Sequence, residues 1–333
     1  MGVRNVVLVL ALLVVGIEAY TYVRGPVRKG ITAPCPGLYC GRIDLNKTHN
    51  SGCGQCLRGW KVNNNTHSLC EPCLESPSMY DWFFLAFHVI FVIVLHMMSI
   101  DYRRRTLSKE VVTLHLCALV EVTGAALLTV VLNEPFGKLE LISCQVKQLS
   151  DWYPFFHNPN PNYEETLHCT QEVVYPLYTM IFLFYALCGV LMLILRSCLV
   201  LKLYPRKGRS SIYAALYFLP ILALIHALCG GLVYMSYPYI VSVLSIISSA
   251  SHFAFKLDQS WKSLITGCFK DKRDFVVLFG HWLLHAFGIL AITQPTNPTA
   301  HLPLLALVPV PALFYVFTAK YTDPNNFGSE MNS

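Results

Sequence analysis

Seven long apolar stretches in succession constrain this chain more than any other feature of its sequence. Most approach the roughly 20 residues that a helix needs to cross the hydrocarbon core of a bilayer at about 1.5 Å per residue. They cover approximately residues 82–100, 111–132, 173–195, 212–234, 239–255, 275–293 and 302–318. We therefore predict an all-α polytopic membrane protein with a seven-helix transmembrane domain over residues 82–318. Tyr237-Pro238 leaves only a tight turn between the fourth and fifth stretches, so these two are predicted to form a hairpin.

The composition agrees with a membrane protein and argues against two other classes. The 333 residues are 54% hydrophobic and 13% charged, whereas soluble domains are closer to about 25% charged. An intrinsically disordered chain needs low hydrophobicity and high charge, which this chain lacks. The net charge of +6 includes no long cationic tract that could neutralise phosphates, so we expect no nucleic-acid partner.

Basic residues in the short loops predict the orientation, because such residues concentrate on the cytosolic side. With a lumenal N-terminus, the cytosolic loops are 101–110, 196–211 and 256–274, and they contain 14 basic residues against 2 in the lumenal loops. The 14 are Arg103, Arg104, Arg105, Lys109, Arg196, Lys202, Arg206, Lys207, Arg209, Lys256, Lys262, Lys270, Lys272 and Arg273. The tail of residues 319–333 is then cytosolic.

Residues 1–19 have the architecture of a signal peptide. Arg4 precedes a short apolar stretch, and Ala19 is a small residue suited to the position before a cleavage site. An uncleaved anchor helix is the alternative. Either arrangement places residues 20–81 outside the cytosol, and two glycosylation sequons, beginning at Asn46 and Asn64, fall in that region.

Cysteines are concentrated ahead of the first apolar stretch. Six of the 13 lie there, at Cys35, Cys40, Cys53, Cys56, Cys70 and Cys73. The last four form two C-x2-C pairs with spacing close to that of a zinc ribbon. An oxidising lumen favours disulfides over zinc, and a region this small needs such cross-links because it cannot build a large core. The pairing stays open, because six cysteines allow 15 connectivities.

Two further cysteines, Cys144 and Cys169, bracket the predicted lumenal loop of residues 133–172. We expect them to form an additional bridge. Loss of one disulfide, for example by Cys56→Ser, is expected to destabilise the small lumenal region by about 2–5 kcal/mol.

Few polar groups fall inside the apolar stretches. Glu121 is the only acidic residue deep in one of them, and an intramembrane carboxyl is costly enough to be a functional candidate by default. The alternative is a protonated Glu121 that hydrogen-bonds to a neighbouring helix. His281 and His285 lie one helical turn apart, so an intramembrane zinc hydrolase that uses them is conceivable, although the glutamate of an H-E-x-x-H motif is absent. We see no other catalytic pattern, and we expect neither an enzyme nor a cofactor.

The predicted cytosolic segments are too short to fold as domains, since they range from 10 to 19 residues. They present basic surfaces suited to binding partners or anionic lipid headgroups. A seven-span signalling receptor shares this layout. However, Asp101-Tyr102-Arg103 follows the first stretch rather than the third, and the last stretch lacks an N-P-x-x-Y pattern.

Several long strings in this sequence resemble the c-Jun N-terminal kinase-associated membrane proteins of the endoplasmic reticulum. They begin with CPGLYCG (35–41), CGQC (53–56), CEPCLESPSMYDW (70–82), LSDWY (149–153) and HCTQEVVYPLYT (168–179). They continue with SIYAALYFLPIL (211–222), HWLLHAFGI (281–289) and PLLALVPVPALFYVFTAKYTDP (303–324). The resemblance covers about residues 34–324 and is specific, because unusual strings recur in order.

The resemblance implies a seven-span adaptor of the endoplasmic reticulum membrane. Such proteins bring proteasomes and RING-type ubiquitin ligases to the membrane for degradation of misfolded proteins, and they prolong c-Jun N-terminal kinase signalling. The family supplies no catalytic residues that could be assigned here. This chain departs from the family in the signal-like leader ahead of Cys35, which leaves open how the N-terminus is translocated.

Overall fold

The structure is a computed structural model that describes residues 34–35, 37–46, 49–63, 68–101, 108–154, 169, 173–203, 208–256, 258–294 and 298–322. The chain divides into two compact units. The first comprises residues 1–72 and 153–172, and the second comprises residues 73–152 and 173–333. The predicted signal peptide, Asn64 and most of the predicted cytosolic tail lie outside the described residues.

The first unit consists of short strands joined by disulfides. Strand β1 (Asp44–Asn46) pairs antiparallel with β2 (His49–Asn50), and β3 (Trp60–Asn63) pairs antiparallel with β4 (Leu69–Pro72). The disulfides are Cys35–Cys53, Cys40–Cys169 and Cys56–Cys70. The chain is therefore mostly helical rather than wholly α-helical, because strands and cross-links organise the region that is too small for a helical core.

The Cys56–Cys70 disulfide packs directly against the backbone of Gly41. Gly41 forms a pair of backbone hydrogen bonds with Gly54, with N–O distances of 2.8 and 2.9 Å. A Cβ atom added to Gly41 would lie 2.7 Å from the sulfur of Cys70 and 2.9 Å from that of Cys56, whereas one added to Gly54 meets nothing within 4 Å. Of these two paired glycines, only Gly41 lacks room for a side chain.

We predict that Gly41→Ala destabilises the first unit by about 1–3 kcal/mol, because the disulfide or the backbone must move to admit the methyl group. Limited proteolysis of the purified protein should show faster cleavage within residues 34–72 for this variant. Gly54→Ala is the matched control and should behave like the wild type. Equal protease resistance of the two variants would contradict the packing described here.

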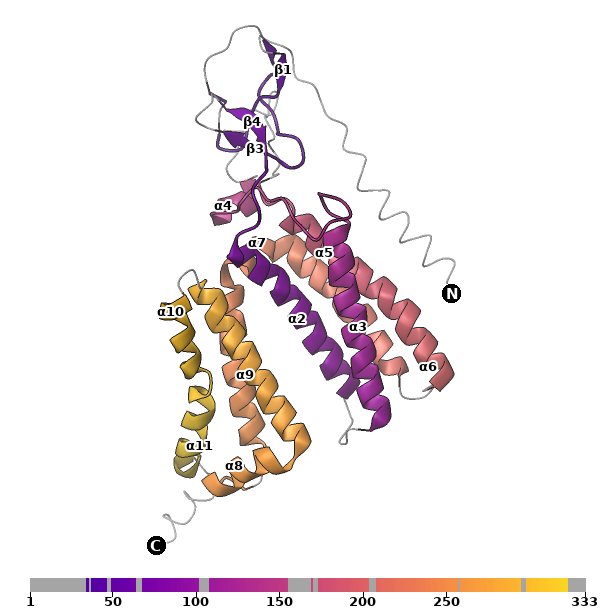
Figure 1. The fold of residues 1–333 in the computed structure, drawn as a ribbon, viewed down its shortest axis with the longest axis vertical. Helices are drawn as coiled ribbons and strands as arrows, with labels where there is room; N and C mark the ends of the chain where they lie inside the picture. The colour runs from indigo at the N-terminus through magenta and orange to yellow at the C-terminus, as the bar shows by residue number, and fades with distance from the viewer. Residues whose placement is uncertain are drawn as a thin grey trace. The chain divides into compact units, whose positions relative to one another are not determined.

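The second unit is helical (Figure 1). Its helices are α2 (Met79–Asp101), α3 (Lys109–Val131), α4 (Leu149–Trp152), α5 (Leu177–Leu191), α6 (Ser197–Leu203), α7 (Arg209–Ala254), α8 (Trp261–Lys270), α9 (Lys272–Thr293), α10 (Pro298–His301) and α11 (Val310–Thr322). A π-helical turn, Met192–Arg196, joins α5 to α6, and a 3-10 turn, Leu302–Leu307, precedes α11.

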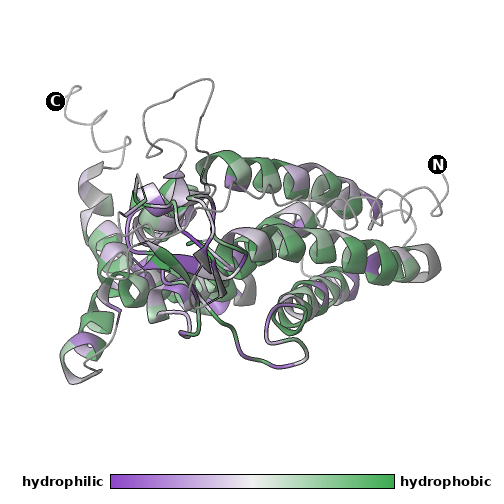
Figure 2. Ribbon diagram, turned by 90° about the horizontal axis from the view of Figure 1, so that it is seen from above, coloured by the Kyte–Doolittle hydropathy of each residue, from purple (hydrophilic) through white to green (hydrophobic). Residues whose placement is uncertain are grey.

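Six helical segments in the described part of the chain are long and apolar enough to cross a membrane. They are Met79–Asp101, Lys109–Val131, Leu177–Val200, Arg209–Ala254, Asp274–Thr293 and Thr299–Ala319. At most 39% of the most apolar window in any of them is buried within the protein, so most of these side chains are left to face lipid. Figure 2 shows the same hydrophobic character along the long helices.

The predicted hairpin at Tyr237-Pro238 is wrong in its local structure, because both residues lie inside α7. This helix has 46 residues, which corresponds to about 69 Å, more than twice the thickness of a hydrocarbon core. In Figure 1 it ascends beside α5, changes direction, and descends beside α9. A bent helix therefore replaces the tight turn.

The neighbourhood of Pro238 explains how the helix continues through the bend. Proline has no N–H to donate to the carbonyl four residues earlier, which belongs to Tyr234. The Tyr80 hydroxyl donates to that carbonyl at 2.8 Å, and the Tyr237 hydroxyl donates to the Tyr80 carbonyl at 3.0 Å. The Tyr234 hydroxyl in turn donates to Asp81 at 2.6 Å. The side chain of Tyr80 on α2 thus satisfies the carbonyl that Pro238 leaves without a partner.

One disulfide lies within the second unit and joins the segment ahead of α2 to the loop between α3 and α4. Cys73 bonds to Cys144, and both pack against Tyr175. The predicted Cys144–Cys169 bridge is therefore wrong, because Cys169 bonds to Cys40. The C-x2-C motifs do not form a zinc site in this structure, because all four of their sulfurs are in disulfides.

Candidate functional site

A buried ion pair joins two of the long helices. Glu121 on α3 and Arg196 at the end of the π-helical turn are both fully buried, with 0% side-chain exposure. The Nε of Arg196 donates to one carboxylate oxygen at 3.1 Å, and its Nη2 donates to the other. This bidentate geometry is the strongest arrangement available to an arginine and a carboxylate.

Two further side chains complete the cluster. The Cys117 thiol donates to Glu121 Oε1 at 3.1 Å. His96 Nδ1 lies 3.2 Å from Nη1 of Arg196. Since a guanidinium can only donate, this nitrogen of His96 accepts and its Nε2 carries the proton. The His96 ring also meets Phe218 of α7 edge to face, at 5.0 Å between centroids. Helices α2, α3 and α7 and the π-helical turn after α5 all contribute to the site or its wall.

Arg196 is the last residue of the π-helical turn. Such a turn places one extra residue in a helical repeat, and it is frequent at functional sites. The predicted position of Arg196 in a cytosolic loop is wrong, because its side chain is fully buried and residues 177–200 form one helical segment long and apolar enough to cross a membrane. The basic count of the predicted cytosolic loops falls from 14 to 13 and still exceeds the 2 of the opposite side.

Hydrogen bonds occupy both carboxylate oxygens of Glu121, so the group forms one half of an ion pair. The unfavourable transfer of each charge into a membrane is offset only while the partner is in place. The cluster can therefore fix the packing of α3 against α5, and any partner that separates those helices must break it.

His281 and His285 take different partners. His281 Nε2 lies 3.5 Å from the Ser248 hydroxyl of α7, and its ring lies 6.3 Å from that of His252. His285 Nδ1 instead faces the carbonyl of Val308 at 3.2 Å. Glu121 belongs to the separate cluster with Arg196. Among the described residues there is no group of three or more His, Cys, Asp or Glu side chains that could hold a metal ion.

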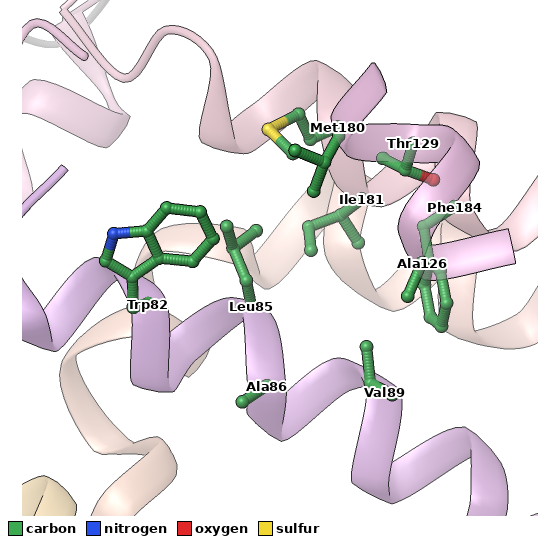
Figure 3. Close-up of a pocket in the computed structure, with 10 residues that line it drawn as sticks. Trp82, Leu85, Ala86, Val89, Ala126, Thr129, Met180, Ile181 and Phe184 are labelled. Carbon is green, nitrogen blue, oxygen red and sulfur yellow. The ribbon is translucent and has the colours of Figure 1, made fainter. Parts of the chain in front are cut away.

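An apolar groove opens between α2, α3 and α5 (Figure 3). Its volume is about 200 Å³. The hydroxyl of Thr129 is already used, since it donates to the carbonyl of Ala125 at 2.7 Å. The lining residues are Trp82, Leu85, Ala86, Val89, Ala126, Thr129, Val130, Met180, Ile181 and Phe184. The groove offers dispersion contacts and shape rather than polar recognition.

Part of the predicted docking and modification surface falls outside the described residues. This applies to residues 102–107, 204–207 and 323–333, and to the sequon at Asn64. Asn46 is the last residue of β1, and the remainder of its sequon is outside the described residues. Glycosylation at both asparagines stays a prediction.

Fold and site together define a polytopic α-helical membrane protein with a disulfide-bonded unit outside its long helices. The chain belongs to the JNK1/MAPK8-associated membrane protein family, which it matches over residues 35–324.

Curated relatives match over most of their length. The JNK1/MAPK8-associated membrane protein of Mus musculus is 45% identical over 309 residues, which is 90% of this chain and 97% of the relative. The Homo sapiens protein of the same name is 44% identical with the same coverage. A Caenorhabditis elegans homolog is 33% identical over 83% of this chain and 85% of its own length. No solved structure matches.

Proposed function

We propose that this protein is an adaptor of the endoplasmic reticulum membrane that gathers ubiquitin ligases and proteasomes for the disposal of misfolded proteins and also binds c-Jun N-terminal kinase. The observation that carries the proposal is family membership across nearly the whole chain. The names of the mouse and human relatives state an association with JNK1/MAPK8 for those proteins.

The architecture supports a binding role. The helices are joined by short connections, such as residues 102–108 and 255–260, and these leave room for recognition segments rather than catalytic domains. The ion pair of Glu121 with Arg196 gives the helices a fixed relative packing. A rigid membrane scaffold with short external segments suits a protein that holds other proteins near one another.

We further propose that the N-terminus faces the lumen and the C-terminus the cytosol. The disulfides favour an oxidising compartment for the first unit, and 13 basic residues favour the cytosol for the opposite loops. The bend near Pro238 would let α7 cross the membrane twice, which gives seven crossings from six helical segments.

Proximity labelling from the C-terminal tail tests the proposal. A labelling enzyme fused after Ser333 should mark proteasome subunits, a ubiquitin ligase and c-Jun N-terminal kinase, and it should do so more strongly in cells with misfolding stress. The matched control carries the same enzyme on an unrelated membrane protein of the endoplasmic reticulum at equal abundance.

Two results would count against the adaptor. One is a set of neighbours identical to that of the control under stress. The other is residence of the protein at the plasma membrane, together with signalling that depends on an external ligand, which would favour a seven-span receptor.

A further inference from the structure

Helix α8 differs in kind from the helices on either side of it. It has 10 residues, begins after the N-cap Ser260, whose hydroxyl accepts from the N–H of Ser263 at 3.4 Å, and is bounded by α7 and α9. Figure 1 shows α8 lying across the ends of these two long helices. It therefore lies at the level where the two spans end.

One side of α8 is part of the protein core. Leu264 and Cys268, one turn apart, are fully buried. They pack in a cluster with Phe253, Leu278, Ala312, Val316 and Ala319. Burial raises the pKa of the Cys268 thiol above its ordinary value, so at neutral pH this side chain is an uncharged apolar contact.

A second apolar stripe on α8 has no cover within the described chain. Trp261, Ile265 and Phe269 recur at four-residue spacing and are 56%, 37% and 67% exposed. At 100° per residue this stripe lies directly beside the buried one. Together the two stripes form a broad apolar face, of which half contacts the helices and half faces outward.

The exposed stripe continues onto the outer face of a membrane span. The ring of Phe269 lies 6.1 Å from that of Phe275, the fourth residue of α9, which in turn stacks on Phe279 at 6.4 Å. Phe275 and Phe279 are about half exposed and lie on α9, which is long and apolar enough to cross a membrane. Because the rings of Phe269, Phe275 and Phe279 are in succession, we expect the α8 stripe to meet the same surroundings as this part of α9.

Charge is arranged to match a lipid headgroup layer. Lys262 and Lys270 are exposed on the polar side of α8, and the ammonium of Lys262 lies 5.6 Å from the centre of the Trp261 ring. Lys256 is already neutralised by Asp274 at 2.6 Å. A tryptophan and a flanking lysine at the edge of an apolar face are typical of a helix in the membrane interface.

We propose that α8 is an interfacial helix that binds anionic phospholipid, with Trp261, Ile265 and Phe269 in the acyl region and Lys262 and Lys270 on the headgroup phosphates. Its interfacial position follows from its place between the ends of α7 and α9 and does not depend on the orientation of the protein. The assignment to the cytosolic leaflet rests on the orientation proposed above. The helix thereby places a surface for anionic lipid next to the segments proposed to recruit partners.

Fluorescence of the full-length protein in lipid vesicles tests the acyl contact. Subtracting the emission spectrum of Trp261→Phe from that of the wild type gives the emission of Trp261 alone. That component should be blue-shifted and quenched by phosphatidylcholine brominated on its acyl chains. A component that is shielded from aqueous acrylamide yet not quenched by brominated lipid would overturn the proposal, because Trp261 would then be covered by protein.

Thermal unfolding tests the headgroup contact. Phosphatidylserine added to phosphatidylcholine vesicles should raise the unfolding temperature of the wild type, and Lys262→Gln with Lys270→Gln should lose most of that shift. Lys138→Gln, an exposed lysine in the loop after α3, should keep it. Retention of the full shift in the double variant would contradict the lysine assignment. Neither measurement involves a protein partner, so failure here is distinguishable from failure of the adaptor proposal.

Discussion

Glu121→Leu should lower the free energy of unfolding by about 3–5 kcal/mol, because it leaves the fully buried Arg196 without its counter-charge. Arg196→Met should be less damaging, since the carboxyl that it leaves behind can take up a proton, whereas a guanidinium cannot lose one. The double variant Glu121→Leu, Arg196→Met should recover most of the stability, because an apolar pair can replace a buried ion pair.

Thermal unfolding in detergent, together with the yield of folded protein, measures these effects. Glu140→Gln is the control, since Glu140 is exposed in the loop after α3 and its loss should change the stability by no more than about 0.5 kcal/mol. A double variant no more stable than Glu121→Leu would show that the pair is not a unit, and the site would then need another description.

Cys56→Ser should destabilise the first unit by about 3 kcal/mol, the value expected when a disulfide that closes a loop of about 15 residues is lost. The Cys56–Cys70 separation in this chain is 14. The single variant also leaves Cys70 as a reactive thiol next to Gly41. Maleimide labelling without reduction should therefore detect one new thiol, and limited proteolysis should cleave residues 34–72 faster.

Two controls separate the disulfide from the free thiol. Cys56→Ser with Cys70→Ser should lose the labelling but stay protease-sensitive, and Cys229→Ser, at a free cysteine of α7, should leave the first unit unchanged. Peptide mapping without reduction should recover Cys56 joined to Cys70. Four reduced thiols at the C-x2-C motifs with bound zinc would overturn the disulfide assignment.

The membrane class could be predicted from the sequence because hydrocarbon demands long apolar runs, and those runs are read directly from the chain. The hairpin was wrong for a reason that local sequence does not contain. Pro238 signals a break only if the carbonyl of Tyr234 has no other partner, and that partner, Tyr80, lies 154 residues away. The distant Tyr80 side chain, which bonds to the Tyr234 carbonyl, allows the helix to continue through Pro238.

The ion pair shows the same limit for the candidate site. Glu121 was identifiable because a lone carboxylate in an apolar stretch is conspicuous. Arg196 is missed because it directly follows the predicted stretch of residues 173–195, where a cation usually marks the start of a cytosolic loop. An intramembrane acid usually pairs with a basic residue at comparable depth, and this rule would have favoured Arg196 as the partner of Glu121. The disulfide pairing was likewise beyond the sequence, because spacing does not say which backbone segments meet.

The buried ion pair also has a consequence for biosynthesis. Glu121 precedes Arg196 by 75 residues, so at about 5–20 residues per second the ribosome adds Glu121 roughly 4–15 s before it adds the counter-charge. During that interval a helix with a costly carboxyl must be kept beside the insertion machinery or take up a proton. The first two helices therefore enter the membrane without the counter-charge that Arg196 supplies to Glu121 in the complete chain.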